Sequence, residues 1–203
     1  MTGPVRTSPS QPREPLRSAE ELIAAISQGD RVAFEALYRR FYPRLFGYLF
    51  NMVGSRELAE ELLDDTMVVV WQNAGRFEHR SRGSTWILGI AYRRALKGLR
   101  RRRREPRRAD PEVALSQAAS RESPETDLDR RELRDTLRVA LRDLSVPQRS
   151  VVLLAYFEDL TYAEIASVLG CPVNTVKTRM FHARRRLRQV LPEMSATRPD
   201  HAL

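Results

Sequence analysis

Residues 161–182, which read TYAEIASVLGCPVNTVKTRMFH, constrain the fold more than any other part of the chain. Thr161 and Glu164 form a capping-box pattern at the start of a short helix with apolar periodicity. Gly170 then supplies a turn, because a residue without a Cβ atom can take a positive φ. A second helix follows, and Ala166 must be small because the two helices cross there at close range. The pattern predicts a helix-turn-helix.

The second helix of this motif exposes side chains of the types that hydrogen-bond to base edges and phosphates. A plain helical hairpin inside an all-α bundle would show the same apolar spacing, but four arginines between positions 184 and 188 favour a DNA-binding role. Residues near the N-terminal end of such a helix reach base edges first. We therefore predict base readout by Asn174, Thr175, Thr178 and Arg179, and phosphate contacts by Lys177, Arg185 and Arg186. His182 and Thr161 complete the candidate DNA-contacting set of this motif, to which the resemblance given below adds the minus-35 element of a promoter as target.

The rest of the chain is also helical in pattern, with caps and breaks between apolar-periodic segments. Ser18 with Glu21 is a capping box, Asp30 and Ser84 are candidate helix caps, and Pro43 should kink or restart the helix that contains it. We find no strand alternation, no repeat and no glycine-rich phosphate loop. The prediction is an all-α protein with two small helical domains joined by a flexible linker. Its parts are a disordered tail 1–17, a first domain 18–104, a linker 105–125, a second domain 126–191 and a tail 192–203.

Charge is distributed in separate blocks. The formal net charge is +9, which suggests a polyanionic partner. Residues 93–108 hold ten basic side chains and one acid, whereas residues 57–65 hold five acids and no base. Opposite blocks of this kind indicate two different kinds of partner.

Several classes of protein are disfavoured. The apolar run 151–157 is far shorter than the ~20 residues of a membrane-spanning helix, and no apolar stretch follows the N-terminal basic residues. A single cysteine, Cys171, excludes a disulfide within the chain and suits the cytoplasm. His79, His182 and His201 are scattered, and no acid–base pair, nucleophile motif or metal-ligand spacing is present. We therefore expect no enzymatic activity, no cofactor or metal, no small-molecule substrate and no membrane insertion.

Three segments resemble the small two-domain sigma factors of the extracytoplasmic-function group, within the sigma-70 family. LSVPQRSVVLLAYFEDLTYAEIASVLGCPVNTVKTRMFHARRRLR is similar to the C-terminal promoter-binding domain of that group. AEELLDDTMVVVWQNAGRF resembles the segment that binds core RNA polymerase, and STWILGIAYRRALKGLRRRRR resembles the segment that opens and holds the promoter strand. The resemblance covers about residues 20–104 and 127–191.

The resemblance implies a sigma-2-like bundle followed by a sigma-4-like helix-turn-helix domain. It further implies binding to core RNA polymerase, recognition of minus-35 and minus-10 promoter DNA, help in strand opening, and control by an anti-sigma factor. The implied polymerase contacts are Glu61, Asp64, Asp65, Thr66 and Trp71. The family often has Gln-Glu where this chain has Asp64-Asp65.

The minus-10 candidates combine aromatic rings, which stack on unpaired bases, with positive charges, which neutralise phosphates. They are Phe77, Arg82, Trp86, Tyr92, Arg93, Arg94 and Lys97. Trp86 is also a candidate core residue, and a core role is favoured over direct base contact; Arg93 stands where the family commonly has asparagine. By resemblance, the loop Phe77–Gly83 captures a flipped base.

The main alternative is a stand-alone helix-turn-helix transcriptional regulator. Such regulators share the motif but normally carry a receiver or ligand-binding domain, and the N-terminal half shows no βα alternation. An enzyme is the third class, and no constellation of residues supports it.

Overall fold

The computed structural model describes residues 17–104 and 136–190, and these ranges contain helices and connecting turns but no β-strand. The all-α prediction is thereby confirmed. The predicted tails (apart from Arg17), the linker and the first ten residues of the predicted second domain lie outside the described residues. None of the helices in the described part has the length and apolar character that a bilayer crossing needs.

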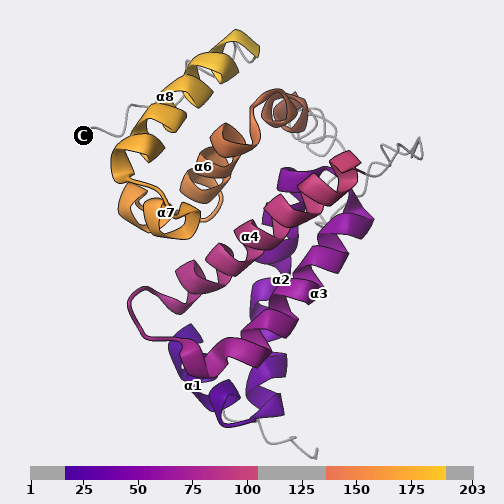
Figure 1. Ribbon diagram of the computed structural model, residues 1–203, viewed down its shortest axis with the longest axis vertical. Helices are drawn as coiled ribbons and strands as arrows, with labels where there is room; N and C mark the ends of the chain where they lie inside the picture. Colours follow the sequence, from indigo (N-terminus) through magenta and orange to yellow (C-terminus); the bar gives the residue numbers. More distant parts are fainter. Residues whose placement is uncertain (1–16, 105–135, 191–203) are drawn as a thin grey trace, which may run out of the picture.

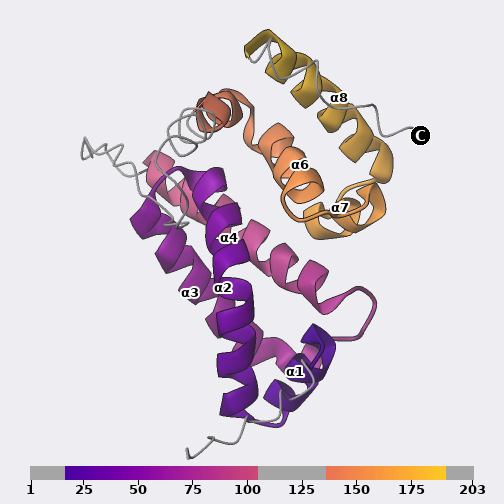
Figure 2. The same cartoon turned by 180° about the vertical axis from the view of Figure 1, so that it is seen from behind.

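Within residues 17–104, the structure contains four α-helices. They are α1 (Ala19–Ser27), α2 (Arg31–Val53), α3 (Arg56–Asn73) and α4 (Gly83–Arg104), with a 3-10 turn η1 (Ala74–Arg76) after α3. In Figures 1 and 2, the long helices α2, α3 and α4 run alongside one another, and α1 lies across one end. Their apolar faces meet in a core that includes Leu37, Leu45, Leu63 and Ile87, each at most 1% exposed.

The predicted caps of α1 and α2 are confirmed. The Ser18 hydroxyl accepts the Glu21 N–H at 3.1 Å, and a Glu21 carboxylate oxygen accepts the Ser18 N–H at 2.6 Å. Asp30 accepts the Ala33 N–H at 3.0 Å. Helix α4 differs from the prediction, because it begins at Gly83, one residue before the expected cap Ser84.

The N-terminus of α4 is satisfied by a residue from a distant helix. The Gly83 N–H donates to the Glu20 carboxylate of α1 at 2.5 Å, and this backbone hydrogen bond lowers the pKa of Glu20. A carboxylate is favourable there because the N-terminal end of a helix carries partial positive charge. The same contact places the start of α4 against α1, close to the loop that precedes it.

Pro43 lies inside α2, which continues on both sides of it rather than restarting. The proline removes one backbone hydrogen bond from the helix interior. Phe41 and Leu45 flank it and are buried at 3% and 0% exposure, so core packing on both sides holds the helical path.

The C-terminal half contains a helical segment 136–143, then α6 (Val146–Tyr156), α7 (Tyr162–Leu169) and α8 (Val173–Val190). Helices α7 and α8 form the predicted helix-turn-helix. The Thr161–Glu164 capping box is present at the start of α7, and Gly170 takes a left-handed φ of 62° at its end. Ala166 is 8% exposed, and its carbonyl accepts the Cys171 N–H at 3.1 Å in the turn.

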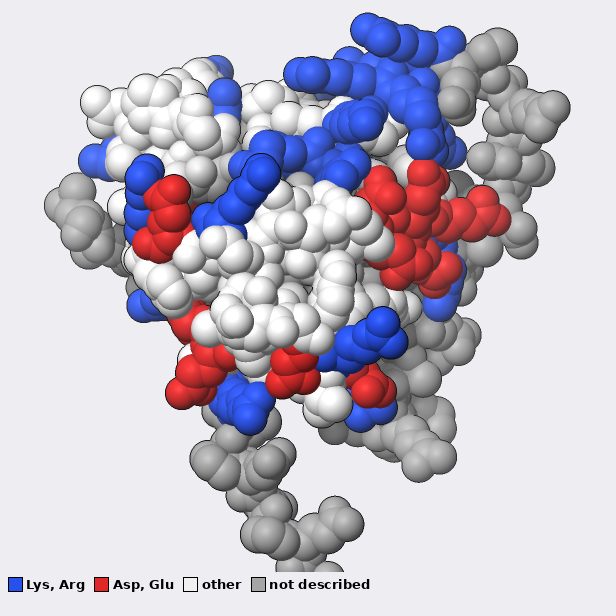
Figure 3. Space-filling model, turned by 60° about the horizontal axis from the view of Figure 1, so that its bottom comes forward, with Lys and Arg blue, Asp and Glu red and all other residues white. Residues whose placement is uncertain are grey.

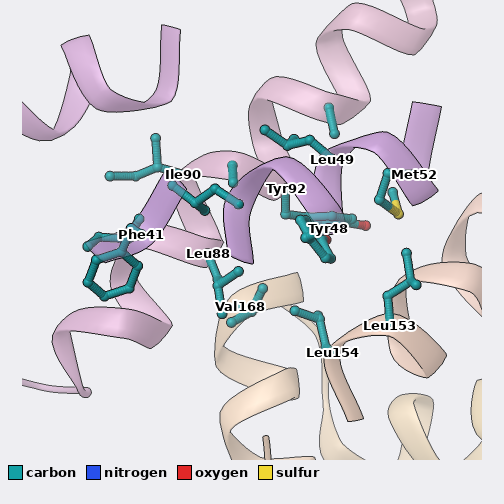
Figure 4. Close-up of a cluster of buried hydrophobic side chains, with 14 of the residues drawn as sticks. Phe41, Tyr48, Leu49, Met52, Leu88, Ile90, Tyr92, Leu153, Leu154 and Val168 are labelled. Carbon is teal, nitrogen blue, oxygen red and sulfur yellow. The ribbon is translucent and has the colours of Figure 1, made fainter. Parts of the chain in front are cut away.

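The two halves pack against each other. Helix α7 lies on α4, and α6 lies on the C-terminal part of α2 (Figures 1 and 2). Figure 4 shows Tyr48 and Met52 of α2 and Leu88 and Tyr92 of α4 facing Leu153, Leu154 and Val168 of the C-terminal half. The buried apolar cluster is therefore continuous from one half to the other.

Candidate polymerase and nucleic-acid interfaces

Acidic and basic side chains form adjoining surfaces on the N-terminal half. Figure 3 shows a cluster of acidic side chains directly beside a band of basic ones. Ion pairs join α3 to α4 at this border: Arg101 bonds Glu61 at 2.9 and 3.0 Å, and Arg94 lies 3.5 Å from Asp65. These pairs are solvent-exposed or nearly so, and each contributes little to folding stability.

Most of the predicted polymerase contacts share the outer face of α3. Glu61, Asp64 and Asp65 are exposed, and Trp71 is half-buried with its ring edge-on to Phe34 at a centroid distance of 5.2 Å. Thr66 is a correction. Its side chain is 0% exposed and its hydroxyl donates to the Leu62 carbonyl at 2.6 Å, because this position faces the core between α3 and its neighbours.

An aromatic row on α2 was missed by the sequence analysis. Rings recur every fourth residue, and successive centroids lie 5.8 to 6.4 Å apart; the members are Phe34, Tyr38, Tyr42, Phe46 and Phe50. We call this set the α2 aromatic row. The Tyr38 hydroxyl donates to Asp64 at 2.9 Å, and burial together with this carboxylate raises the pKa of Tyr38 to about 12. Arg56 of α3 covers the Phe46 ring at 5.5 Å.

The α2 aromatic row therefore follows the seam between α2 and α3, beside the acidic side chains. The signal for it was in the sequence, since side chains four residues apart share one face of a helix. Tyr42 is 36% exposed and the other four rings are partly buried, so the row offers apolar surface to a partner.

The predicted minus-10 residues fall into three groups. Arg93 and Lys97 are exposed on α4, and Arg94 is half-buried beside Asp65. Phe77 and Trp86 pack together at 5.3 Å, so Trp86 is half-buried against the loop that precedes α4. This loop carries a left-handed residue, His79, whose ring lies 4.6 Å from that of Phe77.

The other two minus-10 candidates face the C-terminal half. Tyr92 is 8% exposed, and burial raises the pKa of its hydroxyl. It cannot stack on a base in this arrangement, because α7 packs on α4 and side chains of the C-terminal half face it (Figure 4). Arg82 lies 3.5 Å from Glu164, which completes the capping box of Thr161 at the start of α7.

Helix α8 presents a basic groove with apolar side chains in its lining. The groove has a volume of about 580 Å³ and is lined by Tyr162, Lys177, Met180, Phe181, Arg184, Arg185 and Arg188. Two predicted phosphate contacts, Lys177 and Arg185, lie in it. Phe181 was missed although it stands between them at four-residue spacing, and it is 64% exposed with its ring edge-on to His182. Asn174, Lys177, Thr178 and His182 are exposed, and Thr175 is half-buried.

Four of the predicted minus-35 side chains have hydrogen-bonding partners inside the protein, and one of them is Thr178, whose hydroxyl donates to the Asn174 carbonyl at 3.0 Å. Arg186 pairs with Asp143 of the segment 136–143 through both carboxylate oxygens, away from the groove. Arg179 is half-buried and donates to the Cys171 sulfur at 3.6 Å. Thr161 donates to Glu164 at 2.8 Å within the capping box. Arg186 was predicted to contact a phosphate, whereas in this structure its guanidinium is held by the Asp143 carboxylate.

Comparison with known proteins assigns each half of the chain to a family. A family model described as Sigma-70 region 2 matches residues 37–105, and one described as Sigma-70, region 4 matches residues 134–187. Together the two matches cover more than half of the chain. The chain belongs to the sigma-70 family. This sigma factor is 35% identical over 161 residues to the ECF RNA polymerase sigma factor RpoE of Cereibacter sphaeroides, covering 79% of this chain and 87% of the relative.

Other relatives support the same group. The ECF RNA polymerase sigma factor SigK of Mycolicibacterium vanbaalenii is 31% identical over 183 residues, which is 88% of this sigma factor and 93% of the relative. The sigma factor RpoE of Bartonella quintana, solved in complex with the anti-sigma factor NepR, matches with a TM-score of 0.59 at 28% identity, covering 74% and 91% of the two chains. CnrH, solved with the cytosolic domain of CnrY, shares the fold at a TM-score of 0.62 and 20% identity, over 89% and 99% of the chains. This sigma factor is accordingly of the extracytoplasmic-function type.

Proposed function

We propose that this sigma factor binds core RNA polymerase with the seam between α2 and α3, and recognises promoter DNA with α4, its preceding loop and α8. The observation that carries the proposal is the division of charge between different helices. An acidic surface on α3 suits a basic protein partner, whereas α4 and α8 carry basic side chains suited to phosphates.

The polymerase surface consists of the exposed acids Glu61, Asp64 and Asp65 together with the α2 aromatic row. Aromatic rings supply most of the binding energy at many protein interfaces, and charges around them set partner choice and association rate. A basic amphipathic helix of the polymerase fits this combination. Its apolar side chains would meet the rings while its positive side chains approach the carboxylates.

The minus-10 surface consists of α4 and the loop 77–82. Arg93 and Lys97 are exposed and can neutralise strand phosphates, and Phe77 with Trp86 offers a half-buried pair of rings next to the loop. Aromatic stacking combined with positive charge is the general means of holding a single strand. Such binding favours the opened promoter because it stabilises the separated strand.

The minus-35 surface is α8. A B-DNA major groove is about 12 Å wide and admits one helix with its side chains. Asn174 and Thr178 lie near the N-terminal end of α8 and are proposed for base edges, with Lys177 and Arg185 on phosphates. Phe181 adds apolar surface of the kind that contacts a thymine methyl group.

Regulation by a partner protein belongs to this proposal. The Bartonella quintana relative was solved bound to an anti-sigma factor, and we propose that a protein of that class binds this chain as well. The proposed activity needs polymerase and DNA but no catalytic group of its own, and it takes place in the cytoplasm.

Reconstituted transcription tests the proposal. The full chain is added to core RNA polymerase with fragmented genomic DNA, and the 5′ ends of the transcripts are sequenced. We expect new start sites that share two upstream elements and that disappear when the chain is omitted. A stand-alone regulator would bind DNA but would produce no start sites with core polymerase, and that result would refute the proposal.

A further inference from the structure

The loop 77–82, which precedes α4, is held at both ends by α1. Before the loop, η1 packs on α1, and Ala74 at this contact is 3% exposed. After the loop, α4 begins at Gly83, which is buried against α1. Helix α1 lies beside both of these points in Figures 1 and 2. Residues 78–80 between them are exposed, so the position of the loop depends on its two ends.

The contact between α1 and the start of α4 leaves no room for a side chain at position 83. A Cβ atom added to Gly83 would lie 2.9 Å from the Ile23 Cδ1 atom and 3.1 Å from the Ala19 Cβ atom. Ile23 and Ala19 are themselves buried, at 1% and 7% exposure. The backbone at the start of α4 therefore touches α1 directly, and it cannot shift without breaking this packing.

One hydrogen bond completes the contact. The first N–H groups of a helix have no partner within the helix, and Gly83 carries the first of them in α4. This N–H donates to the half-buried carboxylate of Glu20 at 2.5 Å, and the bond is the main cause of the lowered pKa of Glu20. The carboxylate of Glu20 therefore takes the place of a local helix cap, although it comes from another helix.

The start of α4 in turn supports the aromatic rings beside the loop. Trp86 lies in the first turn of α4, where its N–H donates to the Arg82 carbonyl at 3.0 Å. Its ring packs on Phe77 at 5.3 Å, and the Phe77 ring packs on His79 at 4.6 Å. His79 takes a φ of 54°, which is uncommon for a residue other than glycine, so the loop follows a specific path. A shift of the start of α4 would move Trp86 away from the rings of the loop.

We propose that Glu20 is a positioning residue for promoter opening: through Gly83 it fixes the start of α4, and with it the loop 77–82 that receives the opened strand. The inference rests on the proposed function, which assigns this loop to the opened strand. Glu20 acts through the backbone of Gly83 and does not itself contact DNA. Helix α1, which has no part in the proposed binding surfaces, thereby contributes to strand binding.

Hydrogen exchange of the free full chain, followed by mass spectrometry, tests the positioning without polymerase or DNA. Glu20→Ala should speed exchange in the segment 77–86 by about fivefold, the effect of losing one typical helix cap. Glu20→Gln keeps an acceptor oxygen and should keep most of the protection. Glu21→Ala is the matched control, because Glu21 is the neighbouring acid but accepts the Ser18 N–H at the start of α1. It should leave exchange in the segment 77–86 unchanged.

Strand binding supplies the second measurement. Parent and variants, each assembled with core polymerase, are titrated with a thymidine oligonucleotide of about 12 nucleotides and with an abasic strand of equal length. Glu20→Ala should lower the affinity for the thymidine strand by up to about fivefold, because fewer molecules hold the loop in its binding position. The abasic strand should bind with less than about a twofold change, since Arg93 and Lys97 contact phosphates independently of the loop. Glu20→Gln should bind both strands as the parent does, and this rescue distinguishes a lost acceptor from a general loss of stability.

Two results would overturn the inference. Unchanged exchange in the segment 77–86 of Glu20→Ala would show that Glu20 does not hold the loop. Faster exchange with an unchanged preference for thymidine over the abasic strand would show that strand binding does not depend on this support. If Glu20→Ala lowers the melting temperature of the whole chain, Glu20→Asp provides a second variant that keeps the charge and shortens the reach. A chain that fails to bind core polymerase would refute the proposed function, whereas the exchange of the free chain would still test the role of Glu20.

Discussion

Replacing two neighbouring arginines of α8 one at a time distinguishes a side chain that contacts DNA from one that is bound within the protein. Arg185 lies in the α8 groove and is exposed, whereas Arg186 is held by both carboxylate oxygens of Asp143 on another side of the helix. We predict that Arg185→Ala weakens duplex DNA binding and that Arg186→Ala leaves it nearly unchanged. The two variants remove the same charge from adjacent positions, so each controls for the other.

The magnitude follows from counterion release. Each phosphate contact on B-DNA contributes about 0.9 to the slope of log K against log salt concentration, which near 0.15 M corresponds to about a fivefold change in affinity. Arg185→Ala should therefore reduce the slope by about 0.9 and the affinity by about fivefold, for all sequences alike.

Fluorescence anisotropy with a duplex of mixed sequence at salt concentrations from about 50 to 200 mM measures both quantities. No knowledge of the promoter is needed, because phosphate contacts are independent of sequence. Equal slopes for the two variants would refute the reasoning, since they would mean that the Asp143 partner does not withhold Arg186 from DNA.

Three further predictions concern the other surfaces. Asp64→Lys combined with Asp65→Lys should lower the affinity for core polymerase by at least about tenfold, because close charge pairs across an interface contribute at least that much to binding. Glu35→Lys on α2 should leave the affinity unchanged. Pull-down titration measures these affinities, and equal values for the two variants would argue against binding through the α2–α3 seam. Changing Arg93, Arg94 and Lys97 together to alanine should slow promoter opening more than it weakens polymerase binding. The permanganate reactivity of unpaired thymines measures the rate of opening. An unchanged rate would mean that these side chains are only solvated and do not contact the opened strand. The Thr161 backbone hydrogen bond lowers the pKa of Glu164 below 4.5, so its contribution to stability is present above pH 4.5 and is lost as the pH falls through the folded pKa. Glu164→Gln keeps a capping side chain that does not titrate, and its melting temperature should fall less between pH 7 and about pH 3.5 than that of the parent; identical falls would contradict this.

The features that could be predicted from sequence are those encoded within one or two helical turns. The Ser18 and Thr161 capping boxes, the Gly170 turn and the order of the helices follow from local spacing. The start of α4 was misplaced because its N-terminal N–H is satisfied by Glu20, which lies 63 positions earlier in the chain. No pattern within α4 records that partner.

Site residues were predictable in type but not always in orientation. Thr66 was assigned to a partner surface by resemblance, whereas helical geometry turns it into the core beside Leu62. Arg44 donates to Glu158, which lies 114 positions later, and Tyr92 is covered by a segment from the other half, so their contacts depend on how the halves pack. The α2 aromatic row was available from its spacing and was passed over because its rings resemble ordinary core residues.

The ion pairs between α3 and α4 have a consequence for how the chain moves through a genome. Glu61 and Asp65 occupy Arg101 and Arg94 much as phosphate oxygens would, so these carboxylates compete with the backbone of any DNA the chain meets. Fewer counterions are then released at a random site than a net charge of +9 suggests, and residence there is shorter. A polymerase surface that binds Glu61 and Asp65 would release the two arginines for contacts with promoter phosphates. Tight binding to DNA would then begin only after the chain has bound RNA polymerase.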